Sequence, residues 1–290
     1  MNLARTALVE RLIRLALDED IGTGDITTEC LIDPGMSGVG RIISKESLVL
    51  AGGPVASRVF ELLDPSLVVS IHAEDGRFVP SGTVLMTVEG SMRSLLTGER
   101  TALNFLQRMS GIATHVRNYL QMMKGLSLQL VDTRKTTPGL RVLEKYAVRM
   151  GGARNHRMGL FDGVLIKDNH IAACGGIAPA VSRIRSQISH LMKIEVEVST
   201  LEQVQEALQA GVDVIMLDNM SIEMMRKAVT LIAGKALVEV SGRINAATIP
   251  GLAGAGIDIV SVGALTHSSK SVDISMDIEP ATNVAAERMP

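Results

Sequence analysis

The sequence predicts an α/β protein. We expect an incomplete or modified α/β barrel of about six to seven parallel strands, plus an N-terminal α+β sandwich domain that the C-terminal strand rejoins. In the second half of the chain, apolar strand-like runs alternate with amphipathic helical runs, which is typical of a parallel sheet. The first of these runs is not followed by G-x-G-x-x-G, which disfavours an open dinucleotide-binding sheet. The first half instead carries short alternating runs that are typical of antiparallel strands.

The predicted parallel strands have polar or small residues at or just after their carboxyl ends. In α/β barrels, functional residues lie at the carboxyl ends of the strands, so these residues are candidates for a site. Helical runs at 140–150, 177–190, 201–211, 221–234 and near 244–254 separate strands predicted at 126–132, 163–167, 193–198, 212–219, 236–242 and 257–265. The corresponding end residues are Asp132, Lys167, Glu197, Asp218, Ser241 and Gly263.

The first half is predicted to form the sandwich domain. An amphipathic helix over 1–20 and a Gly/Thr-rich turn at 21–28 precede strands at 39–44, 48–52, 67–73 and 83–90. A long helix then begins near Thr97 and ends at Gly125, because its apolar residues recur with helical spacing. The alternating run at 272–280 predicts a last strand. We therefore expect domains at 1–115 and 116–270, with 271–290 returning to the first.

Composition excludes several classes of protein. Aromatic residues make up 2% of the chain, too few for base-stacking platforms, and a pI near 6.3 removes a general attraction to nucleic acid. Cys30 and Cys174 are too few for a disulfide framework or a cysteine zinc site. The N-terminus lacks a signal-peptide core, and no apolar run is long enough to span a membrane. We expect a cytoplasmic protein that binds neither nucleic acid nor membrane.

Positive charge is concentrated between residues 132 and 170. This stretch holds eight Lys and Arg residues against four Asp and Glu residues, in a chain with a formal net charge of −2. The cations lie in and around two turn-rich segments, 132–139 and 151–159. Loops that carry cations between regular elements often form binding sites, and clustered cations attract anions. The sequence therefore predicts a site for a small polyanionic ligand.

Seven segments carry a resemblance to a known family. They are EDIGTGDITT (19–28), GERTALNFLQRMSGIAT (98–114), DTRKTTPGLRVLEKYAVRMGGARNHRMGL (132–160), IKDNH (166–170), EVEV (195–198), LDN (217–219) and GALTHS (263–268). Taken in order and at their spacing, these segments resemble the quinolinate phosphoribosyltransferase family. The resemblance runs from about residue 18 to about residue 278, and the ordered set is much more specific than any one segment. It implies a pentosyltransferase that moves the phosphoribosyl group of phosphoribosyl pyrophosphate (PRPP) to quinolinate.

The resemblance also implies roles for individual residues. Mg²⁺ is the expected cofactor, held with PRPP by Glu197 and Asp218. A homodimer is expected, in which Arg100 completes the neighbouring subunit's site, and a hexamer of such dimers stays open. The expected catalytic residues are Lys135, Lys167, Glu197 and Asp218. The expected quinolinate-binding residues are Arg100, Thr133, Arg134, His156, Arg157 and Lys167. The expected PRPP-binding residues are Lys135, Lys167, Glu197, Asp218, Ser241, Gly242, Arg243, Val262, Gly263 and Ala264.

The residue types suit this chemistry. Planar guanidinium groups bind carboxylates through two parallel hydrogen bonds, and quinolinate carries two adjacent carboxylates. Carboxylates stabilise the positive charge that develops on the ribose during transfer. Glu195 lies on the same strand face as Glu197, and only the resemblance selects Glu197. Arg243 departs from the small or neutral residue of many relatives, and its role stays open. His267 suits a structural role as well as a ligand role.

Three alternatives follow from the same residues. Lys167 at a strand end would also suit a Schiff-base enzyme, although the dense cations around it disfavour an aldolase. A relative of the same fold could act on another aromatic acid. A non-catalytic barrel could sense phosphorylated metabolites, but it would be expected to lack a strand-end carboxylate, and both Glu197 and Asp218 are present.

Overall fold

The computed structural model describes residues 3–242, 244–245 and 248–281, which form two compact units. The sandwich unit comprises Met1–His115, Thr137–Gly152 and Ser269–Pro290, and the barrel unit comprises Val116–Thr136 and Ala153–Ser268. Residues 137–152 therefore lie in the sandwich unit, whereas the sequence assigned them to the barrel domain. Their helix is tied there by polar contacts, since Tyr146 donates a 2.8 Å hydrogen bond to Asp75.

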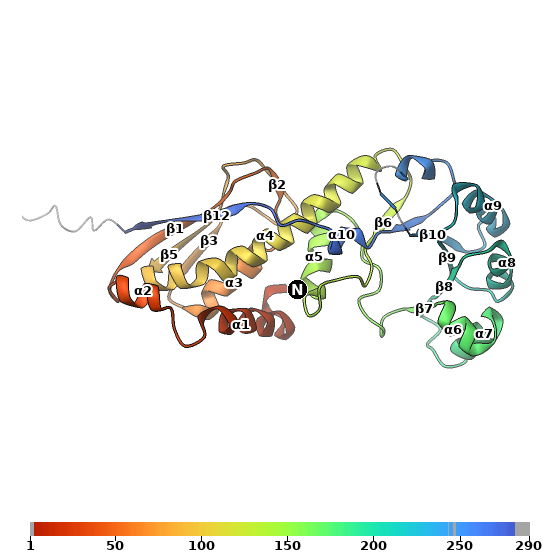
Figure 1. Cartoon of the computed structure of the whole chain (residues 1–290), viewed down its shortest axis with the longest axis horizontal. Coiled ribbons are helices and arrows are strands. Elements are labelled where there is room, and N and C mark those ends of the chain that lie inside the picture. The colour runs from red at the N-terminus through yellow and green to blue at the C-terminus, as the bar shows by residue number, and fades with distance from the viewer. Residues whose placement is uncertain (1–2, 243, 246–247, 282–290) are drawn as a thin grey trace, which may run out of the picture. The chain divides into compact units, whose positions relative to one another are not determined.

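The barrel unit is built on one parallel sheet in the order β6-β11-β10-β9-β8-β7, of which β10, β9, β8 and β7 can be followed in turn in Figure 1. All six strands predicted for the second half are present, and every pair in the sheet is parallel. Strands β6 and β7 are the two edges of the sheet, so the barrel is incomplete, as predicted. The strands are β6 (Gln129–Val131), β7 (Val164–Ile166), β8 (Ile194–Val198), β9 (Val214–Asp218), β10 (Leu237–Ser241) and β11 (Ile259–Ser261).

From β7 onward, each strand of the barrel unit is followed by one or two helices. Thr200 and Ser221 cap the crossover helices α8 and α9 by accepting hydrogen bonds from backbone N–H groups in the first turn. The helix predicted over 177–190 is α7, which ends at Arg185, and the short helix α6 before it was not predicted. Gly175 and Gly176 adopt positive φ between these two helices. The bounds are α6 (Asp168–Cys174), α7 (Ile177–Arg185), α8 (Leu201–Gln209), α9 (Ile222–Ile232), the 3₁₀ helix η2 (Ile249–Leu252) and α10 (Ala264–His267).

Strand alternation explains how acidic side chains enter the barrel. In β8, Val196 and Val198 are buried, and Glu195 and Glu197 alternate with them. The parallel register places Glu197 level with Met216, and Met216 level with Glu239. One face of the sheet therefore carries carboxylates that begin near the strand starts and continue to the strand ends.

The sandwich unit contains a four-stranded antiparallel sheet in the order β12-β1-β5-β3 and a two-stranded pair, β2-β4. Strand β12 pairs with β1 over seven residue pairs, which confirms the predicted return of the C-terminal strand. The strands are β1 (Ser37–Ser44), β2 (Leu48–Val49), β3 (Val68–Ile71), β4 (Phe78–Val79), β5 (Val84–Ser91) and β12 (Ile274–Pro280). The helices are η1 (Leu3–Arg5), α1 (Ala7–Ile21), α2 (Ile26–Leu31), α3 (Gly53–Leu63), α4 (Met92–Met122) and α5 (Arg141–Gly151). The residues of α4 from Val116 onward belong to the barrel unit.

Three helices of the sandwich unit differ from the prediction. Helix α2 begins inside the segment 21–28, which was predicted as a turn. Helix α3 was missed, although Pro54 at its start and its buried apolar face are helix signals. Helix α4 begins at Met92 rather than near Thr97. Within the described residues, no helix is both long and apolar enough to cross a membrane.

Candidate active site

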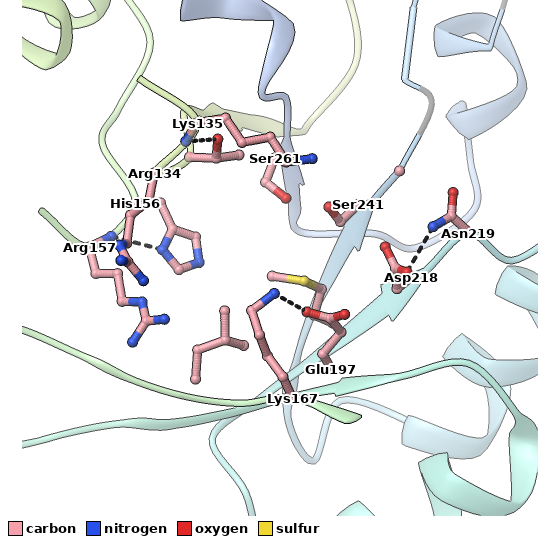
Figure 2. Close-up of a pocket in the computed structure, with 14 residues that line it drawn as sticks. Arg134, Lys135, His156, Arg157, Lys167, Glu197, Asp218, Asn219, Ser241 and Ser261 are labelled. Atoms are coloured by element: carbon pink, nitrogen blue, oxygen red, sulfur yellow. Dashed lines mark hydrogen bonds and ion pairs between the residues drawn. The ribbon is translucent and has the colours of Figure 1, made fainter. Parts of the chain in front are cut away.

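A pocket of about 580 Å³ lies at the carboxyl ends of the barrel strands. All six strands of the sheet, or the residues that follow their ends, contribute to its walls, together with the loop before β7 (Figure 2). It is lined by Thr133, Arg134, Lys135, His156, Arg157, Leu165, Lys167, Glu197, Met216, Asp218, Asn219, Ser241, Gly242 and Ser261. The predicted cations and the predicted carboxylates therefore face the same cavity.

One side of the pocket is cationic. Thr133, Arg134 and Lys135 follow β6, while His156 and Arg157 come from the loop before β7 (Figure 2). Burial lowers the pKa of Arg157, and the nearby charge of Arg134 lowers it further. Two guanidinium groups that repel each other in a partly buried wall would be relieved by an anion placed between them. This wall therefore suits a ligand with more than one negative group.

Buried contacts fix the loop that carries Arg157. The carboxylate of Asp132, which is 0% exposed, accepts hydrogen bonds from the Asn155 side chain at 2.7 Å and from the His156 backbone at 2.9 Å. Arg157 donates from its guanidinium to the Gly163 carbonyl at 3.0 Å. These contacts hold the guanidinium in place before any ligand arrives, which lowers the entropic cost of binding.

The opposite side of the pocket is acidic. Lys167 donates to Glu197, with 2.6 Å between Nζ and Oε2. Asp218 Oδ2 accepts from the Asn219 side chain at 2.7 Å. Asn219 adopts the left-handed conformation at φ 52°, which is uncommon for a residue other than glycine. A Cβ on Gly242 would lie 2.4 Å from Asn219 Oδ1, so Gly242 leaves the room that this side chain needs.

His156 contacts both the cationic loop and the interior of the barrel. Its Nδ1 accepts a hydrogen bond from the Arg157 backbone N–H at 2.8 Å, which places the proton of the neutral ring on Nε2. That Nε2 lies 3.0 Å from Glu195 Oε2 and 3.7 Å from Glu239 Oε1. In this geometry both ring nitrogens are engaged by the protein, so the predicted role of His156 as a quinolinate ligand stays a prediction.

Sequence and structure comparisons agree on one family. A family model described as the C-terminal domain of quinolinate phosphoribosyl transferase matches residues 112–277, and its N-terminal counterpart matches residues 25–110. The chain belongs to the quinolinate phosphoribosyltransferase family.

Named relatives support the family assignment. A Bacillus subtilis protein named a probable nicotinate-nucleotide pyrophosphorylase (carboxylating) is 44% identical over 270 residues, covering 93% of each chain. A Synechocystis relative of the same name is 46% identical over 276 residues, covering 93% of this chain and 92% of the relative. The crystal structure of NadC from Streptococcus pyogenes matches with a TM-score of 0.91 at 44% identity, covering 94% of this chain and 97% of that one.

Some residues that the family resemblance predicted lie outside the pocket lining. Gly263 packs closely against the Lys135 side chain, since a Cβ atom added to Gly263 would lie 2.7 Å from Lys135 Cδ. Val262 is buried and Ala264 begins α10, and neither residue lines the pocket. Arg100 is exposed on α4 of the sandwich unit. Arg243 lies outside the described residues.

Sequence reasoning also missed residues that line the pocket, namely Leu165, Met216, Asn219 and Ser261. Strand alternation could have identified Met216 and Ser261. Met216 lies two residues before Asp218, and Ser261 lies two residues before Gly263, so each shares a strand face with a residue that was predicted for the site. Asn219 carried a weaker signal, as the residue that follows a strand-end aspartate. Its left-handed backbone is visible only in the structure.

The pocket offers a donor set for the Mg²⁺ that the family resemblance implies. Mg²⁺ is usually held by one or two carboxylates together with substrate phosphates and water. Glu197 and Asp218 both line the pocket and come from the neighbouring strands β8 and β9. These residues fit a metal that arrives with a phosphorylated substrate.

Proposed function

We propose that this chain transfers the phosphoribosyl group of PRPP to quinolinate with decarboxylation. The products are nicotinate mononucleotide, pyrophosphate and CO₂, and the reaction belongs to de novo NAD biosynthesis. The observation that carries the proposal is the meeting of two arginines and two lysines with two carboxylates in one pocket, in a chain of this family. A cationic wall serves two anionic substrates, and the acidic wall serves a sugar that becomes positive.

The cationic wall binds quinolinate and orients it. Arg134 and Arg157 take the adjacent carboxylates, and Thr133 lies beside them in the wall. Each charge-assisted hydrogen bond contributes roughly 1.5–3 kcal/mol. Binding both carboxylates fixes the ring in its plane, so that the ring nitrogen faces the sugar. Holding two reactants in line supplies roughly 7–11 kcal/mol of the barrier.

The acidic wall acts on the ribose. As pyrophosphate leaves, positive charge develops at the anomeric carbon, and Glu197 and Asp218 stabilise it. Lys135 and Lys167 are compact point charges that suit the oxygens of the leaving pyrophosphate. Ser241 and Gly242, at the end of β10, suit the 5-phosphate through close approach of the backbone. We propose that Mg²⁺, held by Glu197 and Asp218 with PRPP, supplies further charge neutralisation.

Decarboxylation follows from the substrate itself. Once the ring nitrogen is bonded to ribose it is a pyridinium, whose positive charge stabilises the electron pair left on C2 when CO₂ departs. A proton then replaces the carboxylate. No covalent protein nucleophile is needed, which disfavours the Schiff-base alternative for Lys167.

We also propose that the chain acts as a homodimer in which Arg100 completes the partner's site. Arg100 is exposed on α4, and the family resemblance selects it. The cytoplasmic location stays a prediction as well.

The experiment that tests the function uses purified chain, PRPP and Mg²⁺ with either quinolinate or nicotinate. We expect nicotinate mononucleotide and CO₂ in equal amounts from quinolinate, and much slower turnover of nicotinate. A preference for nicotinate would support the relative that acts on another aromatic acid. No turnover of either substrate, with binding of PRPP retained, would support the sensor.

A further inference from the structure

Three ionisable side chains meet inside the barrel beneath the cationic wall. They are His156, Glu195 on β8 and Glu239 on β10, and their ligand-type atoms lie within 4.8 Å of one another. Glu195 is 8% exposed and Glu239 is 2% exposed. Neither glutamate lines the active-site pocket, and the mechanism above does not use them.

Within the part of the chain that the structure describes, one carboxylate oxygen of the buried Glu239 is left without a hydrogen bond. Among the described residues its Oε1 has no hydrogen-bond partner, and the nearest ring nitrogen, His156 Nε2, is 3.7 Å away. A buried charge without a partner is costly, and taking up a proton removes that cost. The geometry alone therefore favours a neutral carboxyl group at this position.

The neighbouring charges act in the same direction. Burial, followed by the charge of Glu195, raises the pKa of Glu239 to about 7, while His156 and Ser261 lower it by less. Arg157 faces Glu195 from the loop side, with Arg134 and Asp162 around it. Glu239 therefore changes charge close to neutral pH.

Two cavities share the wall above this cluster. His156 and Arg157 line the active-site pocket and also a second cavity of about 710 Å³. Glu195, Glu239 and residues near the strand starts, such as Gln129 and Val214, line the second cavity. The cluster therefore lies directly behind the side chains that face the dicarboxylate, and water in the second cavity would exchange protons with it.

We propose that Glu239 holds a proton beneath the dicarboxylate site, and that quinolinate binds most tightly to the protein form that carries this proton. The inference rests on the proposed function. A dianion at Arg134 and Arg157 neutralises the charges that face Glu195, and an ionised Glu239 would then add a second negative charge behind them. By reciprocity, bound quinolinate raises the affinity of Glu239 for its proton as much as the proton raises the affinity for quinolinate.

The test is the pH dependence of kcat/KM for quinolinate at saturating PRPP, from about pH 6 to about pH 9. In the unmodified protein we expect a fall centred near the pKa of Glu239, by roughly 5- to 150-fold. Glu239→Gln imitates the protonated carboxyl, so it should keep the high value and abolish the fall. The KM for PRPP should stay within about twofold, which a general structural defect would not produce.

Two further variants sharpen the test. Glu202→Gln removes one negative charge from an exposed position on α8 and should keep the unmodified profile. Glu195→Gln removes the charge that raises the pKa of Glu239, so the midpoint should move to lower pH. This second shift decides the question even where Glu239→Gln fails to fold.

Several outcomes would overturn the inference. They are a flat profile in the unmodified protein, a fall that Glu239→Gln retains, and a midpoint that Glu195→Gln leaves in place or raises. A stoichiometric transition metal in the purified protein would also overturn it, because the metal would replace the proton in the cluster. No turnover of quinolinate at any pH would instead refute the proposed function.

Discussion

Lys167 and Glu197 form an ion pair in the pocket wall, with 2.6 Å between Nζ and Oε2. The Lys167 side chain is 45% exposed, so the pair faces the cavity and contributes little to folding. We expect the ion pair to act in catalysis, because it places a cation that suits pyrophosphate beside a carboxylate that suits the sugar.

The first prediction concerns this acidic wall. Glu197→Ala and Asp218→Ala should each lower kcat by about 10²–10³, because stabilisation of the ribosyl cation is lost. The KM for quinolinate should change little. Thermal unfolding of each variant serves as the control, and near-normal kcat in both would refute the assignment of these carboxylates.

Substitutions in the cationic wall should affect the KM for quinolinate rather than kcat. Arg134→Ala or Arg157→Ala should raise the KM for quinolinate by about 10- to 150-fold, from the loss of one charge-assisted contact of roughly 1.5–3 kcal/mol. Arg134→Lys should recover only part of this loss, since an ammonium cannot form two parallel hydrogen bonds. Steady-state kinetics with quinolinate varied decides the matter. An unchanged KM would show that the dicarboxylate binds elsewhere.

Two substitutions of Asn219 distinguish the effect of its strained backbone from the effect of its side chain. Asn219→Gly keeps the left-handed backbone but removes the amide that holds Asp218, so we expect lower kcat with unchanged or higher stability. Asn219→Ala should lower both kcat and stability, the latter by about 1 kcal/mol. Equal kcat in Asn219→Gly and the unmodified protein would show that Asp218 needs no such support.

Glu239 predicts a dependence of stability on pH. Because its pKa rises from 4.5 to about 7 on folding, the folded protein binds more protons than the unfolded chain between these values. The contribution of Glu239 to the free energy of unfolding is therefore fully present below its unfolded pKa, and it is lost as pH rises toward its folded pKa. The Tm of Glu239→Gln relative to the unmodified protein should increase between about pH 5 and about pH 8, by several degrees. A constant difference would place the folded pKa near its ordinary value.

The proposed dimer predicts complementation. Arg100→Ala and Lys167→Ala homodimers should both be nearly inactive, each lacking one part of every site. Mixed dimers should regain activity, because one of their two sites draws an intact Arg100 and an intact Lys167 from different subunits. Activity that never rises on co-refolding or subunit exchange would contradict a shared site.

Much of the barrel followed from the sequence, because strand and helix periods differ and each crossover helix is bounded by turn residues. The runs at 193–198 and 212–219 became β8 and β9 almost unchanged. Helix α6 was missed because seven residues give too few turns for a periodic signal. The assignment of 137–152 differed because the sequence gives no sign that Tyr146 contacts Asp75, which lies 71 residues earlier.

Part of the pocket could also be predicted from the sequence. Strand ends are readable, so Lys167, Glu197, Asp218 and Ser241 were found. Alternation alone did not separate Glu195 from Glu197, since both lie on one face. The structure separates them by depth, because Glu197 lines the pocket while Glu195 lies beneath it with Glu239. Depth along a strand depends on what covers each end of the barrel, which no local pattern encodes.

The central claim is that one cavity binds the dicarboxylate on its cationic side and the sugar on its acidic side. A crystal structure of the chain with quinolinate bound tests it most directly. The account predicts both carboxylates against Arg134 and Arg157, with the ring nitrogen directed toward Glu197 and Asp218. Quinolinate found outside this pocket, or with its nitrogen directed away from those carboxylates, would contradict it.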